Sequence, residues 1–145
     1  MFKHFLLPTD GSAISSAILR PCIEFAKECG ASITAVHVIP EFHVLTYQVE
    51  MLEATREQFR QDSAAHAQRY LAEIEQYARE LGVPCKTLAL HHEQPYEAII
   101  QSAREQGCDL ICMASHGRRG VKGMLLGSET QKVLTHSQIP VLVFR

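Results

Sequence analysis

Five short apolar segments alternate along this chain with four segments whose apolar residues recur at helical spacing. This alternation constrains the fold more than any other feature, because near-continuous apolar strands joined by helices are typical of a parallel sheet covered on both faces. The pattern predicts strands over residues 2–7, 31–39, 85–90, 109–114 and 140–144, and helices over 13–29, 53–81, 95–106 and 128–136.

Local signals refine the first helix. Pro21 lies inside the helical pattern 13–29, and we expect it to kink that helix or to split off its first turns. Asp10 and Ser12 are both of the residue types that cap helices, so either could cap this one. Residues 41–52 give no clear pattern.

We expect a single domain spanning residues 1–145, since this length is ordinary for one domain. The element order predicts a doubly wound α/β fold of the Rossmann-like type, with a five-stranded parallel sheet and right-handed crossovers. Ligands of such sheets bind beyond the carboxyl ends of the strands, where the strand order reverses. If the strand order is 3-2-1-4-5, the order we predict, the loops 8–12 and 115–127 meet over one crevice.

Charge and hydropathy argue against two broad classes of partner. The chain has 14 Lys and Arg residues against 16 Asp and Glu residues, a net charge of −2, which argues against nucleic-acid binding driven by charge. No apolar run approaches the roughly 18 residues of a membrane helix. The first residues show no signal-peptide pattern, so we expect a cytoplasmic protein without a membrane segment.

The cysteines are 5 in number and include no CxxC pair. Cys22 and Cys29 are separated by about 10 Å along a predicted helix, too far for a disulfide. Cys108 and Cys112 are separated by about 13 Å if that segment is extended. We interpret the cysteines as reduced, buried thiols, as in a reducing compartment, ahead of a redox or metal-binding role.

The glycine-rich stretch 113–130, MASHGRRGVKGMLLGSET, matches neither GxxxxGK[ST] nor GxGxxG. Glycines nevertheless let backbone N–H groups approach an anion, and Gly127-Ser128 is expected to open a helix whose N-terminus attracts phosphate. Two alternatives stay open. Ser128 and Gln131 form a capping-box pattern that needs no ligand, and the basic residues within 118–122 are equally typical of a solvated surface loop.

Motifs at both ends of the chain resemble those of the universal stress protein family. They are PTDGS at 8–12, HVIP at 37–40, and SHGRRG, LLGSET and IPVLVFR within 115–145, in the family's order over nearly the full length. The family's nucleotide-binding pattern is G-x2-G-x9-G-[ST]. Here it reads Ala114-x2-Gly117-x9-Gly127-Ser128, so the spacing is kept and alanine replaces the first glycine.

The resemblance implies an ATP-binding protein of the stress response, with an adenine nucleotide alpha hydrolase-like fold. AMP and ADP would use much the same contacts as ATP, and Mg²⁺ would be held mainly by the phosphates. The residues that the resemblance places around the nucleotide are Pro8, Thr9, Asp10, Val38, Met113, Ala114, Gly117, Gly127, Ser128, Glu129 and Thr130. The alternatives are a protein of the same fold that acts through protein partners without nucleotide, and a slow ATPase or autophosphorylating protein.

The sequence offers no convincing catalytic set. Asp10 and His116 are the only candidates expected near the phosphates, and we favour a structural hydrogen bond for His116. The cluster 91–93, His-His-Glu, suggests a metal site, but adjacent strand residues point to opposite faces, so we expect none. His4 and His37 lie in predicted strands, and we expect both to be satisfied core or strand-end groups.

The last predicted strand, within residues 139–144, is apolar and lies at the sheet edge in the predicted order. An exposed edge of this kind invites pairing with another strand. The resemblance implies a homodimer through this strand, and two-fold symmetry is the common arrangement. The alternative is an edge covered by a helix of the same chain.

Overall fold

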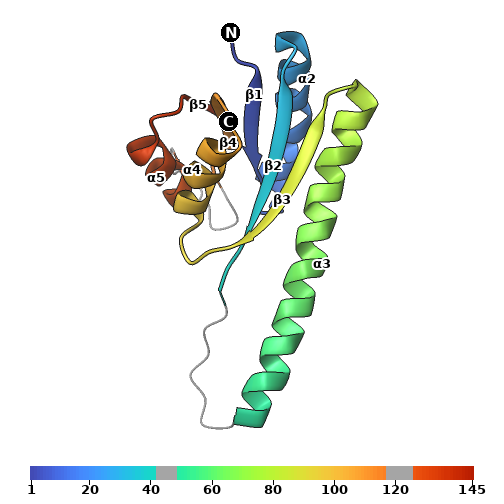
Figure 1. Ribbon diagram of the computed structural model, residues 1–145, viewed down its shortest axis with the longest axis vertical. Coiled ribbons are helices and arrows are strands. Elements are labelled where there is room, and N and C mark those ends of the chain that lie inside the picture. The colour runs from blue at the N-terminus through green and yellow to red at the C-terminus, as the bar shows by residue number, and fades with distance from the viewer. Residues whose placement is uncertain (42–48, 117–125) are drawn as a thin grey trace.

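The computed structural model describes residues 1–41, 49–116 and 126–145, with the side chains of 49–52 left aside. Strands and helices alternate in the predicted order, with element ends shifted by a few residues (Figure 1). In chain order the elements are β1 (His4–Pro8), α1 (Ala13–Ala17), α2 (Leu19–Cys29), β2 (Ser32–Ile39), α3 (Val49–Leu81), β3 (Cys85–His91), α4 (Pro95–Glu105), β4 (Leu110–Ala114), α5 (Ser128–His136) and β5 (Val141–Phe144).

The five strands form one parallel sheet in the order β3-β2-β1-β4-β5, which confirms the predicted fold class. Phe5 of β1 lies opposite Ile33 of β2 on one side and Leu110 of β4 on the other. The order reverses between β1 and β4, since successive strands are added toward β3 before the chain crosses to β4 and β5. The switch point expected from the sequence is therefore present.

Two apolar clusters cover the two faces of the sheet. Phe5 and Leu7 of β1 belong to the cluster under α2 and α3, whereas Leu6 between them belongs to the cluster that includes Ile99 of α4 and Val133 of α5. Successive strand residues point to opposite faces, which explains why one strand supplies both clusters. Figure 1 shows the same layers, with α2 and α3 on one side of the sheet and α4 and α5 on the other.

The segment predicted as one helix over 13–29 consists of α1 and α2, which meet at Ile18. Pro21 is the third residue of α2, in the first turn, where a missing N–H group removes no helical hydrogen bond. Regular bonding resumes at once, because the Cys22 N–H donates to the Ile18 carbonyl at 3.0 Å. The expected splitting of the first turns is confirmed.

Helix α3 begins at Val49, earlier than the predicted Glu53, and is 33 residues long. Its sheet-facing residues are Ala67, Leu71, Ile74 and Ala78, which are buried. Figure 1 shows that its N-terminal half extends past the carboxyl ends of the strands, the end of the sheet at which the predicted ligand crevice lies.

The structure places the thiols mainly inside the molecule. Cys22, Cys108 and Cys112 are buried, while Cys29 and Cys85 are half-buried, and all five are free. A hydrogen bond with the Cys112 thiol, together with burial, raises the pKa of the Cys22 thiol. Burial also raises the pKa of Cys85 and that of Cys108, each to about 11. Buried thiols of this kind are poor nucleophiles at neutral pH.

Candidate functional site at the carboxyl ends of β1 and β4

The register of the strands places Thr9 in the middle of the candidate site. Leu6 lies opposite Ile111 of β4, and carrying this register forward sets Thr9 opposite Ala114. On the other side Pro8 lies opposite Val36 of β2, and the Thr9 N–H donates to the Val36 carbonyl at 2.9 Å. Thr9 is 6% exposed. The ends of β1 and β4 therefore lie side by side, with Val36 of β2 next to them. Most of the loop 115–127 lies outside the described residues, so its meeting with the loop 8–12 stays a prediction.

The loop after β1 is held by its own short side chains. The Thr9 hydroxyl oxygen accepts hydrogen bonds from the Gly11 N–H at 3.2 Å and from the Ser15 hydroxyl at 3.0 Å. Asp10 Oδ1 accepts from the Ser12 N–H at 2.9 Å. Ser12 in turn caps α1, because its Oγ accepts from the Ser15 N–H at 3.1 Å. Of the two predicted caps, Ser12 has that role and Asp10 stabilises the turn before it.

The end of β4 is joined to the start of α5 by two hydrogen bonds. The Gly127 N–H donates to the Ser115 carbonyl at 2.6 Å, and the Thr130 hydroxyl donates to the Ala114 carbonyl at 2.9 Å. The first turn of α5 therefore stands directly beyond the last residues of β4. This is the geometry in which free N–H groups of a helix N-terminus face a ligand above the sheet.

The capping-box prediction for Ser128 was wrong. Gly127 is the N-cap of α5, with extended backbone at φ −70° and ψ 160°, and Ser128 is the first helical residue. Gln131 therefore lies outside the capping-box position, and its side-chain amide donates to the Leu126 carbonyl at 3.0 Å. Ser128 is exposed at the positive end of the helix, where its hydroxyl is open to a ligand or to solvent.

Glu129 and Thr130 anchor the first turn of α5 to neighbouring elements. Glu129 accepts from the Tyr96 N–H at 3.0 Å and from Lys132 at 3.2 Å. Gln94, the N-cap of α4, supplies no side-chain bond, so a carboxylate from another helix takes that role. Thr130 is buried, and its hydroxyl donates to the Ala114 carbonyl. These positions fix α5 against α4 and β4, and their expected nucleotide contacts remain predictions.

The remaining predicted residues line the same end of the sheet or fall outside the described chain. Pro8 ends β1, and Val38 near the end of β2 packs partly against the α4 and α5 cluster. Met113 is buried in that cluster, one residue before the end of β4. Gly117 and the basic residues within 118–122 lie outside the described residues.

The replacement of a glycine by Ala114 causes no backbone strain. Among the described residues, every positive φ angle belongs to a glycine, so Ala114 has an ordinary backbone conformation. Its side chain is half-buried against the α2 and α3 cluster, while its carbonyl accepts from Thr130. An alanine therefore fits this position, with its methyl group packed against that cluster.

Three of the described histidines have structural partners. His116 Nδ1 lies 2.9 Å from the Ser115 hydroxyl, as expected for a structural hydrogen bond. His4 Nε2 lies 2.7 Å from the Thr34 hydroxyl, and His37 is buried with its ring hydrogen-bonded to Thr9. Over residues 1–41, 49–116 and 126–145, no three His, Cys, Asp or Glu side chains form a group that could hold a metal ion.

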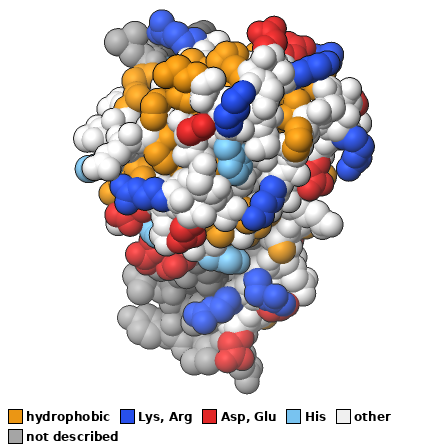
Figure 2. All heavy atoms as spheres, turned by 45° about the horizontal axis from the view of Figure 1, so that its top comes forward, with side chains coloured by type: hydrophobic (Ala, Val, Ile, Leu, Met, Phe, Trp, Pro, Cys, Tyr) orange, Lys and Arg blue, Asp and Glu red, His pale blue; other side chains and the backbone are white. Residues whose placement is uncertain are grey.

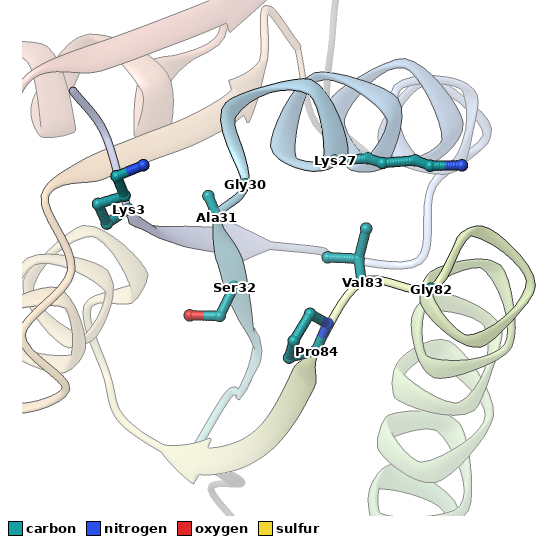
Figure 3. Close-up of a pocket in the computed structure, with 8 residues that line it drawn as sticks. All are labelled: Lys3, Lys27, Gly30, Ala31, Ser32, Gly82, Val83 and Pro84. Carbon is teal, nitrogen blue, oxygen red and sulfur yellow. The ribbon is translucent and has the colours of Figure 1, made fainter.

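A hollow at the other end of the sheet is unrelated to this site. It has a volume of about 300 Å³ and is lined by Lys3, Lys27, Gly30, Ala31, Ser32, Gly82, Val83 and Pro84 (Figure 3). The Lys3 ammonium donates to the Cys29 carbonyl at 3.3 Å, so this lysine complements the negative end of α2. The surface at this end mixes basic, acidic and apolar side chains over the atoms that Figure 2 colours.

Sequence reasoning missed two residues that support the loop after β1. Tyr70 of α3 lies against Gly11 so closely that a Cβ atom there would overlap the tyrosine ring. His37 was predicted only as a satisfied strand residue, yet its ring donates to the Thr9 carbonyl at 2.8 Å. For Tyr70 the only sequence signal was the glycine in PTDGS, which is compatible with a close approach by a distant side chain. The bond from His37 to Thr9 had no local signal.

The parallel sheet, whose strand order reverses between β1 and β4, defines a doubly wound α/β domain. The chain belongs to the universal stress protein family, whose model matches residues 1–145. The Bacillus subtilis universal stress protein YxiE is 33% identical to it over 149 residues, covering 100% of each chain.

Solved structures agree with this assignment. Protein MJ0577 of Methanocaldococcus jannaschii is 29% identical, with a TM-score of 0.82 over 99% of this chain and 95% of its own. A family protein from Arabidopsis thaliana, solved with AMP bound, is 16% identical, with a TM-score of 0.69 over 98% of this chain and 90% of its own. Within the part of the chain that the structure describes, no helix is long and apolar enough to cross a membrane.

Proposed function

We propose that this protein binds an adenine nucleotide, with ATP as the expected ligand, in the crevice beyond β1 and β4. The observation that carries the proposal is the spacing Ala114-x2-Gly117-x9-Gly127-Ser128, whose last pair forms the N-terminus of α5 directly beyond β4. The helix N-terminus favours phosphate through its free N–H groups and its dipole. The AMP bound to the Arabidopsis relative is consistent with this ligand class.

In this proposal different residues contact the adenosine part and the phosphates of the nucleotide. Thr9 and Asp10, with the backbone of Val38, hold the adenosine part. Met113 and Ala114 line the ribose side, while Gly117, Gly127 and Ser128 hold the phosphates. A Mg²⁺ ion would be held mainly by the phosphates.

The biological role that we propose is a nucleotide-dependent regulatory or binding function in the stress response, in the cytoplasm and as a homodimer. The β5 edge supports the dimer, because β5 pairs with β4 on one side and all four of its residues stay half-buried. An apolar edge strand with free N–H and C=O groups is a ready pairing surface.

Calorimetric titration of nucleotide-stripped protein with Mg·ATP, and separately with AMP, tests the nucleotide proposal. We expect micromolar binding that is lost in Gly127→Val, because a branched side chain at the buried N-cap fills the space above the first turn of α5. Ser128→Ala should weaken binding without affecting the fold, since Ser128 is exposed. The control Ser32→Ala, at the opposite end of the sheet, should bind as the wild type does. An intact, folded protein that binds neither nucleotide would refute the proposal and favour a function through protein partners.

A further inference from the structure

His37 is a buried ionisable residue that the proposed nucleotide contacts leave unexplained. It is 8% exposed, and its ring Nδ1 lies 2.8 Å from the Thr9 carbonyl oxygen. A carbonyl oxygen only accepts, so the Nδ1 atom carries the hydrogen and donates it. His37 therefore holds the main chain of the residue on which the crevice is centred.

Strand alternation places the His37 ring on the α3 side of the sheet. Ile33 and Ala35, its neighbours at two-residue spacing, belong to the cluster under α2 and α3, while Val36 and Val38 face α4 and α5. The ring meets Tyr70 of α3 edge-on, with centroids 5.2 Å apart and an interplanar angle of 72°. His37 thus connects β1, β2 and α3 just below the crevice.

Tyr70 covers the next part of the loop. Gly11 has φ 75°, a conformation that glycine adopts readily, and its Cα faces the Tyr70 ring at a distance that leaves no room for a Cβ atom. Tyr70 is itself fixed by neighbours on α3, since His66 stacks on its ring at 6.0 Å and the Arg69 guanidinium lies 5.4 Å from its centroid. Two side chains from outside the loop therefore restrain its main chain.

The consequence concerns the free energy of ligand binding. Thr9 is bonded through its N–H to Val36 and through its carbonyl to His37, so both of its peptide groups are held. Asp10 follows immediately, and the direction of its side chain depends on that backbone. A site whose loop is already ordered loses less conformational entropy when a ligand binds, and this raises affinity.

We propose that His37 and Tyr70 are positioning residues for adenine-nucleotide binding, which hold the Thr9–Gly11 backbone in its binding conformation from the α3 side of the sheet without touching the nucleotide. The inference rests on the proposed nucleotide function. It also couples ligand binding to α3. The loop packs on this helix through Tyr70, so a ligand that orders the loop also stabilises the helix, and the coupling acts in both directions.

Four variants test the role of His37 and Tyr70. His37→Leu introduces an apolar side chain of similar bulk and removes the hydrogen bond, whereas His37→Asn keeps an N–H donor near the position of Nδ1. We expect the Kd for Mg·ATP to rise about tenfold in His37→Leu, the equivalent of about 1.4 kcal/mol, and to return to within about threefold of the wild type in His37→Asn. Tyr70→Ala should raise the Kd and Tyr70→Phe should not, since the ring supplies the contact.

The matched control is His4→Leu. His4 also lies on a strand and bonds a neighbouring strand through its ring, at 2.7 Å to Thr34, but at the opposite end of the sheet. It should lower stability much as His37→Leu does and leave the Kd unchanged. Hydrogen exchange of the ligand-free proteins gives a readout independent of affinity, with the Asp10 and Gly11 amides exchanging faster in His37→Leu than in His4→Leu.

The outcomes separate the two proposals. A wild-type protein that binds nucleotide, together with a His37→Leu variant of equal affinity or equal loop exchange, overturns the positioning role alone. A raised Kd in His4→Leu would also overturn it, because the effect would then be general destabilisation. A folded wild-type protein that binds no nucleotide overturns both proposals.

Discussion

The hydroxyl of Thr130 donates a 2.9 Å hydrogen bond to the main-chain carbonyl of Ala114, and so joins the first turn of α5 to the last residue of β4. The bond crosses the point at which the sheet ends and the proposed phosphate-binding helix begins. Because Thr130 is buried, the carbonyl would have no ready access to water if the hydroxyl were removed. This contact is one of two hydrogen bonds that join the start of α5 to the end of β4.

We predict that Thr130→Val, which keeps the shape of the side chain, lowers the free energy of unfolding by about 1–3 kcal/mol, because it leaves a buried carbonyl unsatisfied. Urea denaturation measures the change. Thr135→Val is the matched control, since Thr135 lies on the same helix and its hydroxyl donates to the Gln131 carbonyl at 2.8 Å on the exposed surface. Its cost should stay within about 0.5 kcal/mol. Equal losses in the two variants would contradict a structural role for the Thr130 bond.

We predict that Glu129→Ala destabilises the protein by about 1 kcal/mol, the usual cost of losing a helix cap. The Glu129 carboxylate accepts from the Tyr96 N–H in the first turn of α4, a helix whose own N-cap supplies no side-chain bond. Glu129→Gln should recover part of the loss, because an amide oxygen still accepts but carries no charge toward the helix N-terminus. Thermal unfolding should show the order wild type, Gln, Ala. The control Glu105→Ala, at the exposed end of α4, should unfold with the wild type.

Two glycines with similar backbone angles should respond differently to alanine. Gly11 has φ 75° and Gly30 has φ 63°, so both substitutions incur the cost of a left-handed alanine, on the order of 1 kcal/mol. Only at Gly11 would the new Cβ overlap another side chain, the Tyr70 ring, whereas the space at Gly30 is open. We expect Gly11→Ala to cost at least about 1 kcal/mol more than Gly30→Ala in chemical denaturation. If Gly30→Ala proved the more damaging variant, the Tyr70 contact would not exist in solution.

The layer architecture was predictable from the sequence because it depends on periodicity. Periodicity predicts which face of each element is buried, independently of any ligand. Examples are the apolar run 109–114 and the helical pattern through Ala67, Leu71 and Ile74. The location of the site followed from the same logic, since parallel strands that reverse their order place Thr9 and Ala114 together. The periodicity required only local sequence, whereas the strand order that joins Thr9 to Ala114 was a prediction that the structure confirms.

The capping error and the partners that the sequence did not name both concern contacts between distant segments. The Ser128 and Gln131 spacing indicated a capping box, but Gly127 is the N-cap: its backbone is extended and its carbonyl accepts from the Gln131 N–H at 3.0 Å, while its own N–H is bonded to the distant Ser115 carbonyl. Likewise, the carboxylate of Glu129 and the ring of His37 find their partners on other elements, on α4 and at Thr9. No local spacing encodes such pairs, so they required the folded structure.

The buried thiols predict a loss of stability in alkaline solution. Burial raises the pKa of Cys85 and of Cys108 from the ordinary value of 9.0 to about 11. The folded protein therefore keeps these protons at pH values where the unfolded chain has lost them. The free energy of unfolding should be steady below about pH 9 and should fall as the pH rises from about 9 to about 11. A Cys85→Ala/Cys108→Ala double variant should show a shallower fall in urea denaturation, and an unchanged slope would contradict the assignment.

The last prediction concerns the proposed dimer interface at β5. Val143 is half-buried on the edge strand and belongs to neither apolar cluster, so a charged residue there should leave the fold intact while opposing strand pairing. We expect sedimentation velocity to show a dimer for the wild type and a monomer for Val143→Lys, with matching circular dichroism spectra. The control Leu134→Lys places the same charge on exposed α5, where the leucine is 41% exposed, and should remain dimeric. A monomeric wild type would refute pairing through β5, and a dimeric Val143→Lys would place the interface elsewhere on the molecule.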